Sequence, residues 1–140
     1  MNKIMKNENK VLSKNQKIVF DFIQKHKKPV KAYSILSNVK KKGIKAPPQV
    51  YRALDKLIKI GKIHKIESQN SFIACNTKHC TSSHTTAFSI CNTCDEVLEI
   101  NDPKLLKFLS GFKDSSGVQF VGYNLEFFGT CKSCEQIHES

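Results

Sequence analysis

The chain has 140 residues, a formal net charge of +11 and six cysteines. This length allows one domain or two small ones, and no apolar run approaches the roughly 18 residues that a membrane-spanning helix needs. The N-terminal stretch MNKIMKNENK lacks the apolar segment of a signal peptide. We therefore expect a cytoplasmic protein with no membrane partner, in which cysteines stay reduced and bind metal more often than they form disulfides.

The charge is distributed unevenly along the chain. Residues 1–65 contain 18 Lys and Arg against 3 acidic residues, whereas residues 66–140 contain 5 against 9, so the two parts carry +15 and −4. An imbalance of this size favours a nucleic-acid-binding module joined to a module that does not bind nucleic acid. The alternative, a lysine-rich surface that is only solvated, is more typical of a single short run.

Apolar residues recur at helical spacing in three stretches of the first half. The predicted helices cover residues 13–27, 31–43 and 46–61. Ser13 is a suitable N-cap for the first helix and Pro29 stops it, while Gly43 and Gly61 end the other two. The apolar sides carry Ile18, Val19, Phe22 and Ile23 in the first helix, Tyr33, Leu36 and Val39 in the second, and Val50, Leu54, Leu57 and Ile58 in the third.

The third helix keeps a polar side that carries Tyr51, Arg52 and Lys56. Residues 62–75 follow, in which two apolar runs flank the turn-like ESQN, so we predict a β-hairpin. Three helices and a hairpin make a winged helix, whose third helix enters the major groove of DNA. Lysines would contact phosphates, and Arg52 would contact a guanine edge. The alternatives are that Tyr51 only packs and that Lys56 is only solvated.

The second half predicts a smaller domain of helix and sheet. Residues 88–100 alternate like a strand around a Cys-x-x-Cys, and residues 117–131 are rich in aromatic and β-branched side chains, which favours one or two strands. The stretch DPKLLKFLSGF is typical of a helix capped by Asp102. Its predicted buried residues are Leu105, Leu106 and Leu109. So small a sheet leaves surface that a second copy would cover, so we expect a homodimer.

Two Cys-x-x-Cys pairs carry the metal chemistry of this half, namely Cys91 with Cys94 and Cys131 with Cys134. Four thiolates suit the corners of a closed tetrahedral zinc site, which stabilises the fold and cannot catalyse because no coordination position is open. Four unrelated buried cysteines or a redox dithiol are the alternatives. The sequence contains no HExxH, phosphate-binding loop or nucleophile elbow, so we do not expect an enzyme.

Together these motifs resemble a known family. The stretch APPQVYRALDKLIKIGKIHKIES, followed by SFIAC, HTTAFSICxxC and a terminal CxxC, is similar to the ferric uptake regulator (Fur) family, and most closely to its zinc uptake regulator (Zur) branch. The resemblance implies an α+β fold with an N-terminal winged-helix DNA-binding domain and a small α/β dimerisation domain. We place these at residues 1–75 and 88–140, with a hinge at 76–87.

The resemblance also implies roles for individual residues. It places a structural zinc on Cys91, Cys94, Cys131 and Cys134, a regulatory zinc on His64, Cys75, His84 and Glu99, and DNA contacts on Tyr33 and Arg52. The polar side of the third helix adds Tyr51 and Lys56 to the expected DNA contacts. One thiolate, two imidazoles and one carboxylate suit tetrahedral zinc better than ferrous iron. A phosphate contact for His64 and a solvent-facing position for Glu99 are the alternatives. We therefore expect two zinc ions per chain.

These inferences predict a zinc-responsive repressor that binds palindromic operator DNA as a zinc-loaded homodimer and controls zinc uptake genes. It would need no small-molecule substrate beyond the metal ion. The regulatory zinc would join the winged helix to the dimerisation domain and fix the spacing of the two DNA-binding domains. The alternatives are an iron or peroxide sensor of the same family, and a zinc-ribbon module that only mediates protein interactions.

Overall fold

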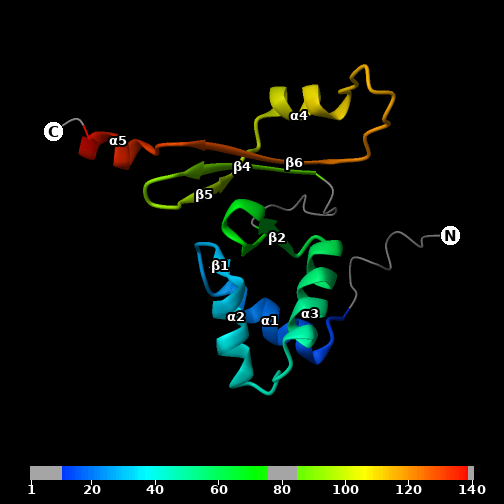
Figure 1. The fold of residues 1–140 in the computed structure, drawn as a ribbon, viewed down its shortest axis with the longest axis vertical. Helices are drawn as coiled ribbons and strands as arrows, with labels where there is room; N and C mark the ends of the chain where they lie inside the picture. Colours follow the sequence, from blue (N-terminus) through cyan, green and yellow to red (C-terminus); the bar gives the residue numbers. More distant parts are fainter. Residues whose placement is uncertain (1–10, 76–84, 139–140) are drawn as a thin grey trace. The chain divides into compact units, whose positions relative to one another are not determined.

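The computed structural model describes residues 11–75 and 85–138 and divides the chain into two compact units, residues 1–81 and 82–140 (Figure 1). The first unit is mainly helical with a small sheet, and the second combines a sheet with two helices. This mixture of helix and sheet agrees with the predicted α+β class. Across the two described ranges, no helix is long and apolar enough to cross a membrane.

Ser13 caps the first helix, α1 (Lys14–Gln24), as predicted. Its hydroxyl accepts the N–H of Gln16 at 3.2 Å, and the Gln16 side chain accepts the N–H of Ser13 at 3.0 Å, which completes a capping box. The helix ends three residues before the predicted end. The Nδ1–H of His26 donates to the Phe22 carbonyl at 2.8 Å, and the residue before Pro29 avoids the helical conformation.

Glycine ends the next two helices, α2 (Ala32–Lys40) and α3 (Pro47–Lys59), as predicted. Gly43 and Gly61 both adopt positive φ angles, 104° and 79°, that glycine tolerates best. After α3, the N–H groups of Gly61 and Lys62 donate back to the carbonyls of Ile58 and Leu57 at 3.0 and 2.9 Å. This Schellman motif satisfies carbonyls that would otherwise lack partners.

The buried side of α2 differs from the predicted one. Ala32, Ile35 and Val39 face the core, whereas Tyr33 is 68% exposed and Leu36 is half-buried. Both sets of residues satisfy helical spacing. The observed rotation buries the aliphatic Ile35 and leaves the phenol hydroxyl of Tyr33 in water, which avoids burying a polar group.

The three helices pack around one apolar core that they share with the wing sheet. The predicted stripe of α3 is confirmed at Val50, Leu54 and Leu57, with Ile58 half-buried at its margin. In α1 the fully buried residues are Val19 and Ile23. This core fixes α3 against the rest of the unit and leaves its opposite side exposed.

The predicted hairpin is present as β2 (Ile63–Ile66) and β3 (Ser71–Ala74), joined by a 3-10 turn at Glu67–Gln69. A two-residue strand, β1 (Val30–Lys31), pairs with the other edge of β3, so the strand order is β1-β3-β2. The sequence did not predict β1, because two residues carry no periodicity. Three helices and this sheet form the predicted winged helix.

In the second unit, β4 (Thr85–Cys91) is the central strand of three. It pairs antiparallel with β5 (Val97–Glu99) and parallel with β6 (Tyr123–Gly129). Figure 1 shows β6 running along β4. A parallel pair needs a long crossover, which α4 (Pro103–Ser110) and residues 111–122 supply. The stretch 117–131 therefore contributes one strand.

The helices of the second unit agree with prediction at the cap of α4 but differ in the burial of α4 and in the presence of α5. Asp102 caps α4 by accepting the N–H of Lys104 at 3.0 Å, as predicted. The three leucines of α4 are only half-buried, which corrects the predicted buried side, because a three-stranded sheet is too small to cover them. The C-terminal helix α5 (Lys132–His138) was not predicted, since its sequence KSCEQIH has little apolar periodicity.

Candidate metal centre and nucleic-acid interface

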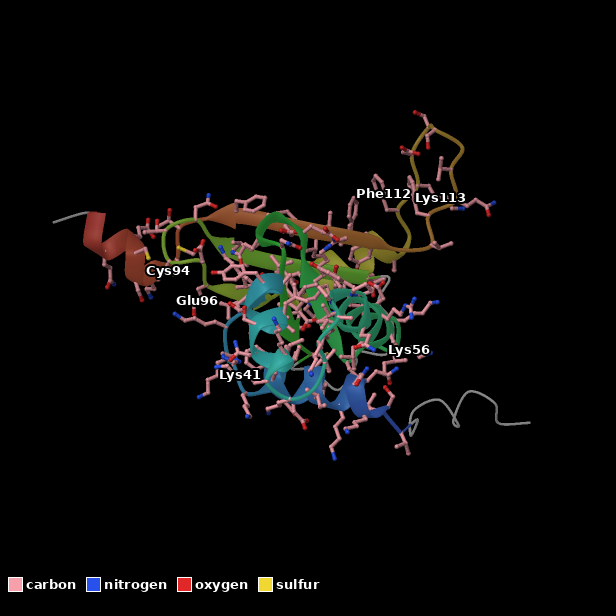
Figure 2. All side chains as sticks on the ribbon, turned by 60° about the horizontal axis from the view of Figure 1, so that its bottom comes forward. Lys41, Lys56, Cys94, Glu96, Phe112 and Lys113 are labelled. Carbon is pink, nitrogen blue, oxygen red and sulfur yellow. The ribbon has the colours of Figure 1, made fainter. Side chains whose placement is uncertain are left out.

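The parallel pairing of β4 with β6 brings the two Cys-x-x-Cys pairs together. Cys91 is the last residue of β4 and lies opposite Gly129 at the end of β6. Two residues after Gly129 comes Cys131, and Cys134 lies on α5. Figure 2 shows Cys94 at the end of the sheet from which α5 starts. The second unit therefore contains the whole four-cysteine site.

The four sulfur atoms have the spacing of a metal site. All lie within 4.8 Å of one another, and the sulfurs of Cys94 and Cys131 are 3.8 Å apart. A tetrahedron with zinc–sulfur bonds of about 2.3 Å has edges of about 3.8 Å. A disulfide would need about 2.05 Å, and all four cysteines are free. The donor set therefore fits zinc and excludes a formed disulfide.

Hydrogen bonds already favour thiolate at one corner of the site. The N–H of Cys131 donates to the Cys91 sulfur at 3.2 Å. This bond, with a second from the backbone of Cys94, lowers the pKa of Cys91 to about 6. Hydrogen bonding to the Cys131 thiol and burial raise the pKa of Cys134 to about 12. Neighbouring thiols cannot all ionise without a cation between them, and a bound Zn²⁺ supplies that charge.

The wing carries a second pair of metal-type ligands. His64 lies on β2 and is 3% exposed, so the alternative of an exposed phosphate contact does not fit. Burial lowers the pKa of His64, which favours the neutral imidazole that binds metals. The Cys75 N–H donates to the Lys62 carbonyl at 3.0 Å, and its sulfur lies within 4.8 Å of a His64 ring nitrogen.

The other two predicted ligands fall elsewhere in the chain. Glu99 is the last residue of β5 in the second unit, where it pairs opposite Phe88 and is half-buried. Burial raises the pKa of its carboxyl group. The alternative, in which Glu99 is an ordinary solvent-exposed strand residue, therefore does not fit its partial burial. His84 lies outside the described residues.

The exposed side of α3 has the features of a DNA-contacting surface. Tyr51 is 44% exposed, Arg52 is exposed, and Lys56 is half-buried. Figure 2 labels Lys56 on α3. On α2, the side chain of Tyr33 is also largely exposed. Lys65 and Glu67 form a salt bridge at 3.4 Å, and residues 11–75 contain 15 Lys and Arg against 3 acidic residues. Most of the positive charge of these residues is therefore not neutralised within the first unit.

Sequence reasoning missed an aromatic cluster in the second unit. Phe108 on α4 lies 5.8 Å from Phe112, and Phe112 stacks on Phe120 at 5.9 Å between ring centroids. With Val121 and Leu125 they line a cavity of about 700 Å³ beside β6. The three phenylalanines are exposed, which is unusual for aromatic side chains in this number. Their spacing along the chain follows no single period, so periodicity could not find them.

Comparisons with known proteins agree with this architecture. Residues 6–128 match the profile described as the ferric uptake regulator family. The zinc uptake regulation proteins of Escherichia coli (strain K12) and Shigella flexneri are each 31% identical over 109 residues, or 77% of this chain. That alignment covers 63% of the length of these curated relatives.

Two solved structures are similar over most of the chain. The crystal structure of holo XcZur has a TM-score of 0.78 and 35% identity, covering 91% of this chain and 89% of that one. A zinc uptake regulator complexed with zinc and DNA has a TM-score of 0.80 and 27% identity, covering 99% and 92%.

Proposed function

Because the chain belongs to the ferric uptake regulator family, we propose that it is a zinc-responsive transcriptional repressor that binds palindromic operator DNA as a zinc-loaded homodimer and controls zinc uptake genes. The observation that carries the proposal is a strongly basic winged helix whose wing holds a cysteine beside a buried histidine. The similarity to zinc uptake regulation proteins supports the choice of metal. The activity is regulatory and not enzymatic.

In this proposal, the four cysteines bind a structural zinc. Its ligands join the turn after β4 to the start of α5, and all belong to one unit. A closed site of four thiolates contributes its binding free energy to folding and leaves no position for a substrate. Its role is to stabilise the second unit, whether or not DNA is bound.

A regulatory zinc has a different task. His64 and Cys75 belong to the first unit and Glu99 to the second, while His84 completes the proposed ligand set. One ion bound by all four residues would join the two units. The mixture of one thiolate with two imidazoles and one carboxylate selects zinc over ferrous iron, which prefers more oxygen and nitrogen ligands.

The switch follows from the entropy of DNA binding. Without the regulatory zinc, each winged helix is free to move relative to its dimerisation domain, and binding a two-fold operator must restrict both. With zinc bound, that restriction is already made, so operator binding becomes more favourable. Zinc needs only to bind the arrangement that fits DNA better than the others.

The aromatic cluster and β6 supply the proposed dimer surface. β6 is an outer strand of its sheet, and the cavity beside it is lined by exposed phenylalanines. A second copy would bury this apolar surface and cover the strand edge. Each dimer would then present two winged helices, whose symmetry matches a palindromic site.

A selection experiment tests the proposal. Reduced, zinc-loaded protein is used to select duplexes from a random pool, and binding to the enriched duplex is measured by fluorescence anisotropy with and without zinc. We expect a palindromic consensus and a gain in affinity of about 5- to 150-fold on adding zinc. A response to iron or peroxide in place of zinc would contradict the proposed metal. Failure to enrich any duplex would favour the interaction-module alternative.

A further inference from the structure

A basic groove lies on the first unit, apart from the exposed side of α3. It is a cavity of about 460 Å³ between the end of α1 and the start of α2. This volume is within the range of about 300–1,000 Å³ that is typical of ligand sites. The polar residues that line it are His26, Lys27, Lys28, Lys31, Ser34 and Asn38.

The groove combines uncompensated positive charge with neutral donors. No acidic side chain lines it, and within residues 11–75 and 85–138 none of its three lysines forms a salt bridge. All three lysines are exposed. Ser34 contributes a hydroxyl, and one N–H of Asn38 remains after the other donates to the Ser34 carbonyl at 2.7 Å. Ammonium groups with hydroxyl and amide donors are the groups that bind phosphate oxygens.

The wall of the groove is held in place. The ring of His26 donates to the Phe22 carbonyl at 2.8 Å and lies 4.8 Å from the Phe22 ring. On the other side, Lys31 is fixed by its strand, which pairs with Ser71 of β3. The lysine ammonium groups therefore extend from a backbone that two neighbouring elements position.

The groove adjoins a residue of the proposed DNA surface. Tyr33 lies between Lys31 and Ser34 in the chain, and both of these neighbours line the groove. Consecutive Cα atoms are about 3.8 Å apart, whereas phosphates follow the axis of one DNA strand every 3.4 Å or so. Tyr33 and the groove therefore share the start of α2, so a duplex that contacts Tyr33 lies close to the groove lysines.

We propose that the groove lined by Lys27, Lys28 and Lys31 binds the sugar-phosphate backbone of DNA beside the site that α3 reads. This inference rests on the proposed DNA-binding function and adds a sequence-independent contact to it. The contact would widen the protected stretch of DNA and contribute to affinity without contributing to the choice of sequence.

The test compares two variants with the same change in net charge. In the groove variant, Lys27, Lys28 and Lys31 are replaced by Gln in the full chain. In the control, Lys104, Lys107 and Lys113, which are exposed residues of the second unit, are replaced by Gln (Figure 2 labels Lys113). Binding of each reduced, zinc-loaded protein to a 40-base-pair duplex of arbitrary sequence is measured by anisotropy over a range of salt concentrations. Circular dichroism and gel filtration confirm the fold and the oligomeric state.

The salt dependence separates the outcomes. For the groove variant we expect the slope of log K against log salt to fall in magnitude by about 2–3, since each phosphate contact contributes about 0.9. The control should keep the slope of the unmutated protein, and replacing the three groove lysines by Arg should restore it. Equal slopes for the groove variant and the control would overturn the inference, and an acidic protein partner would then be the better candidate. If the unmutated protein bound no DNA, the proposed function itself would fail.

Discussion

Replacing Cys131 by Ser should destabilise the second unit by removing its zinc. The sequence between Cys94 and Cys131 is a loop of 36 residues that the metal closes. Closing a loop of this length lowers the entropy of the unfolded chain by an amount equivalent to about 4 kcal/mol. Only seven described residues of the second unit are buried, so its apolar core offers little to offset the loss. Total stabilities are typically about 5–15 kcal/mol, so a loss of about 4 kcal/mol would remove from about a quarter to about four-fifths of a typical stability.

Hydrogen exchange followed by mass spectrometry reports each unit separately. Peptides from residues 85–138 should exchange much faster in Cys131→Ser, while the core peptides of α1 and α3 should exchange as before. Metal analysis should show one fewer tightly bound zinc per chain. Ser133→Ala is a matched control, because this exposed residue lies between Cys131 and Cys134 and is not a ligand. A Cys131→Ser protein with unchanged zinc content and exchange would refute the structural-zinc assignment.

Three further predictions concern the winged helix. Arg52→Ala should cost about 1–3 kcal/mol at one base position of the operator, measured with duplexes that vary one position at a time; equal losses on unrelated sequences would show that Arg52 contacts only phosphate. Leu57→Ala should lower the free energy of unfolding by about 2–5 kcal/mol in urea titrations, because Leu57 is fully buried; a change under about 1 kcal/mol would mean that the core collapses around the gap. Gly61→Ala should cost about 1–2 kcal/mol in the same assay, because its φ of 79° strains any L side chain; an unchanged midpoint would contradict this.

Sequence patterns predicted the first unit well, for local reasons. Ser13 with Gln16, Gly43 and Gly61 mark helix ends through short-range hydrogen bonds, and α3 has a clear apolar stripe. These signals lie within a few residues of the structure that they specify. The side of α2 was predicted wrongly because Tyr33 and Ile35 both satisfy helical spacing, and only packing against the rest of the unit distinguishes them.

The second unit was less predictable because its structure depends on distant partners. Aromatic and β-branched residues favoured one or two strands at 117–131, but they do not say that a single strand, β6, pairs parallel with β4. The half-buried leucines of α4 reflect a surface that the single chain leaves uncovered. In contrast, the cysteine spacing alone predicted which four residues would meet, since ligand geometry constrains distant segments directly.

Two of the four proposed ligands of the regulatory zinc, His64 and Cys75, lie together within the first unit. His64 and Cys75 are close because register places the start of β2 beside the end of β3. Sequence analysis paired them only through the family resemblance. The thiolate form of cysteine is the metal ligand, so measurements on this site use a reducing buffer.

The most direct test is a zinc titration of operator binding. Chelator-treated, reduced dimer that keeps its structural zinc is mixed with the selected operator duplex, and anisotropy is followed as zinc is added to the unmutated protein, to Cys75→Ser, to His84→Ala and to the double variant. We predict that zinc raises the affinity of the unmutated protein by about 5- to 150-fold, that each single variant stays dimeric and responds little, and that the double variant is no worse than either, since all remove one site. A zinc response in Cys75→Ser equal to that of the unmutated protein would contradict the proposed switch.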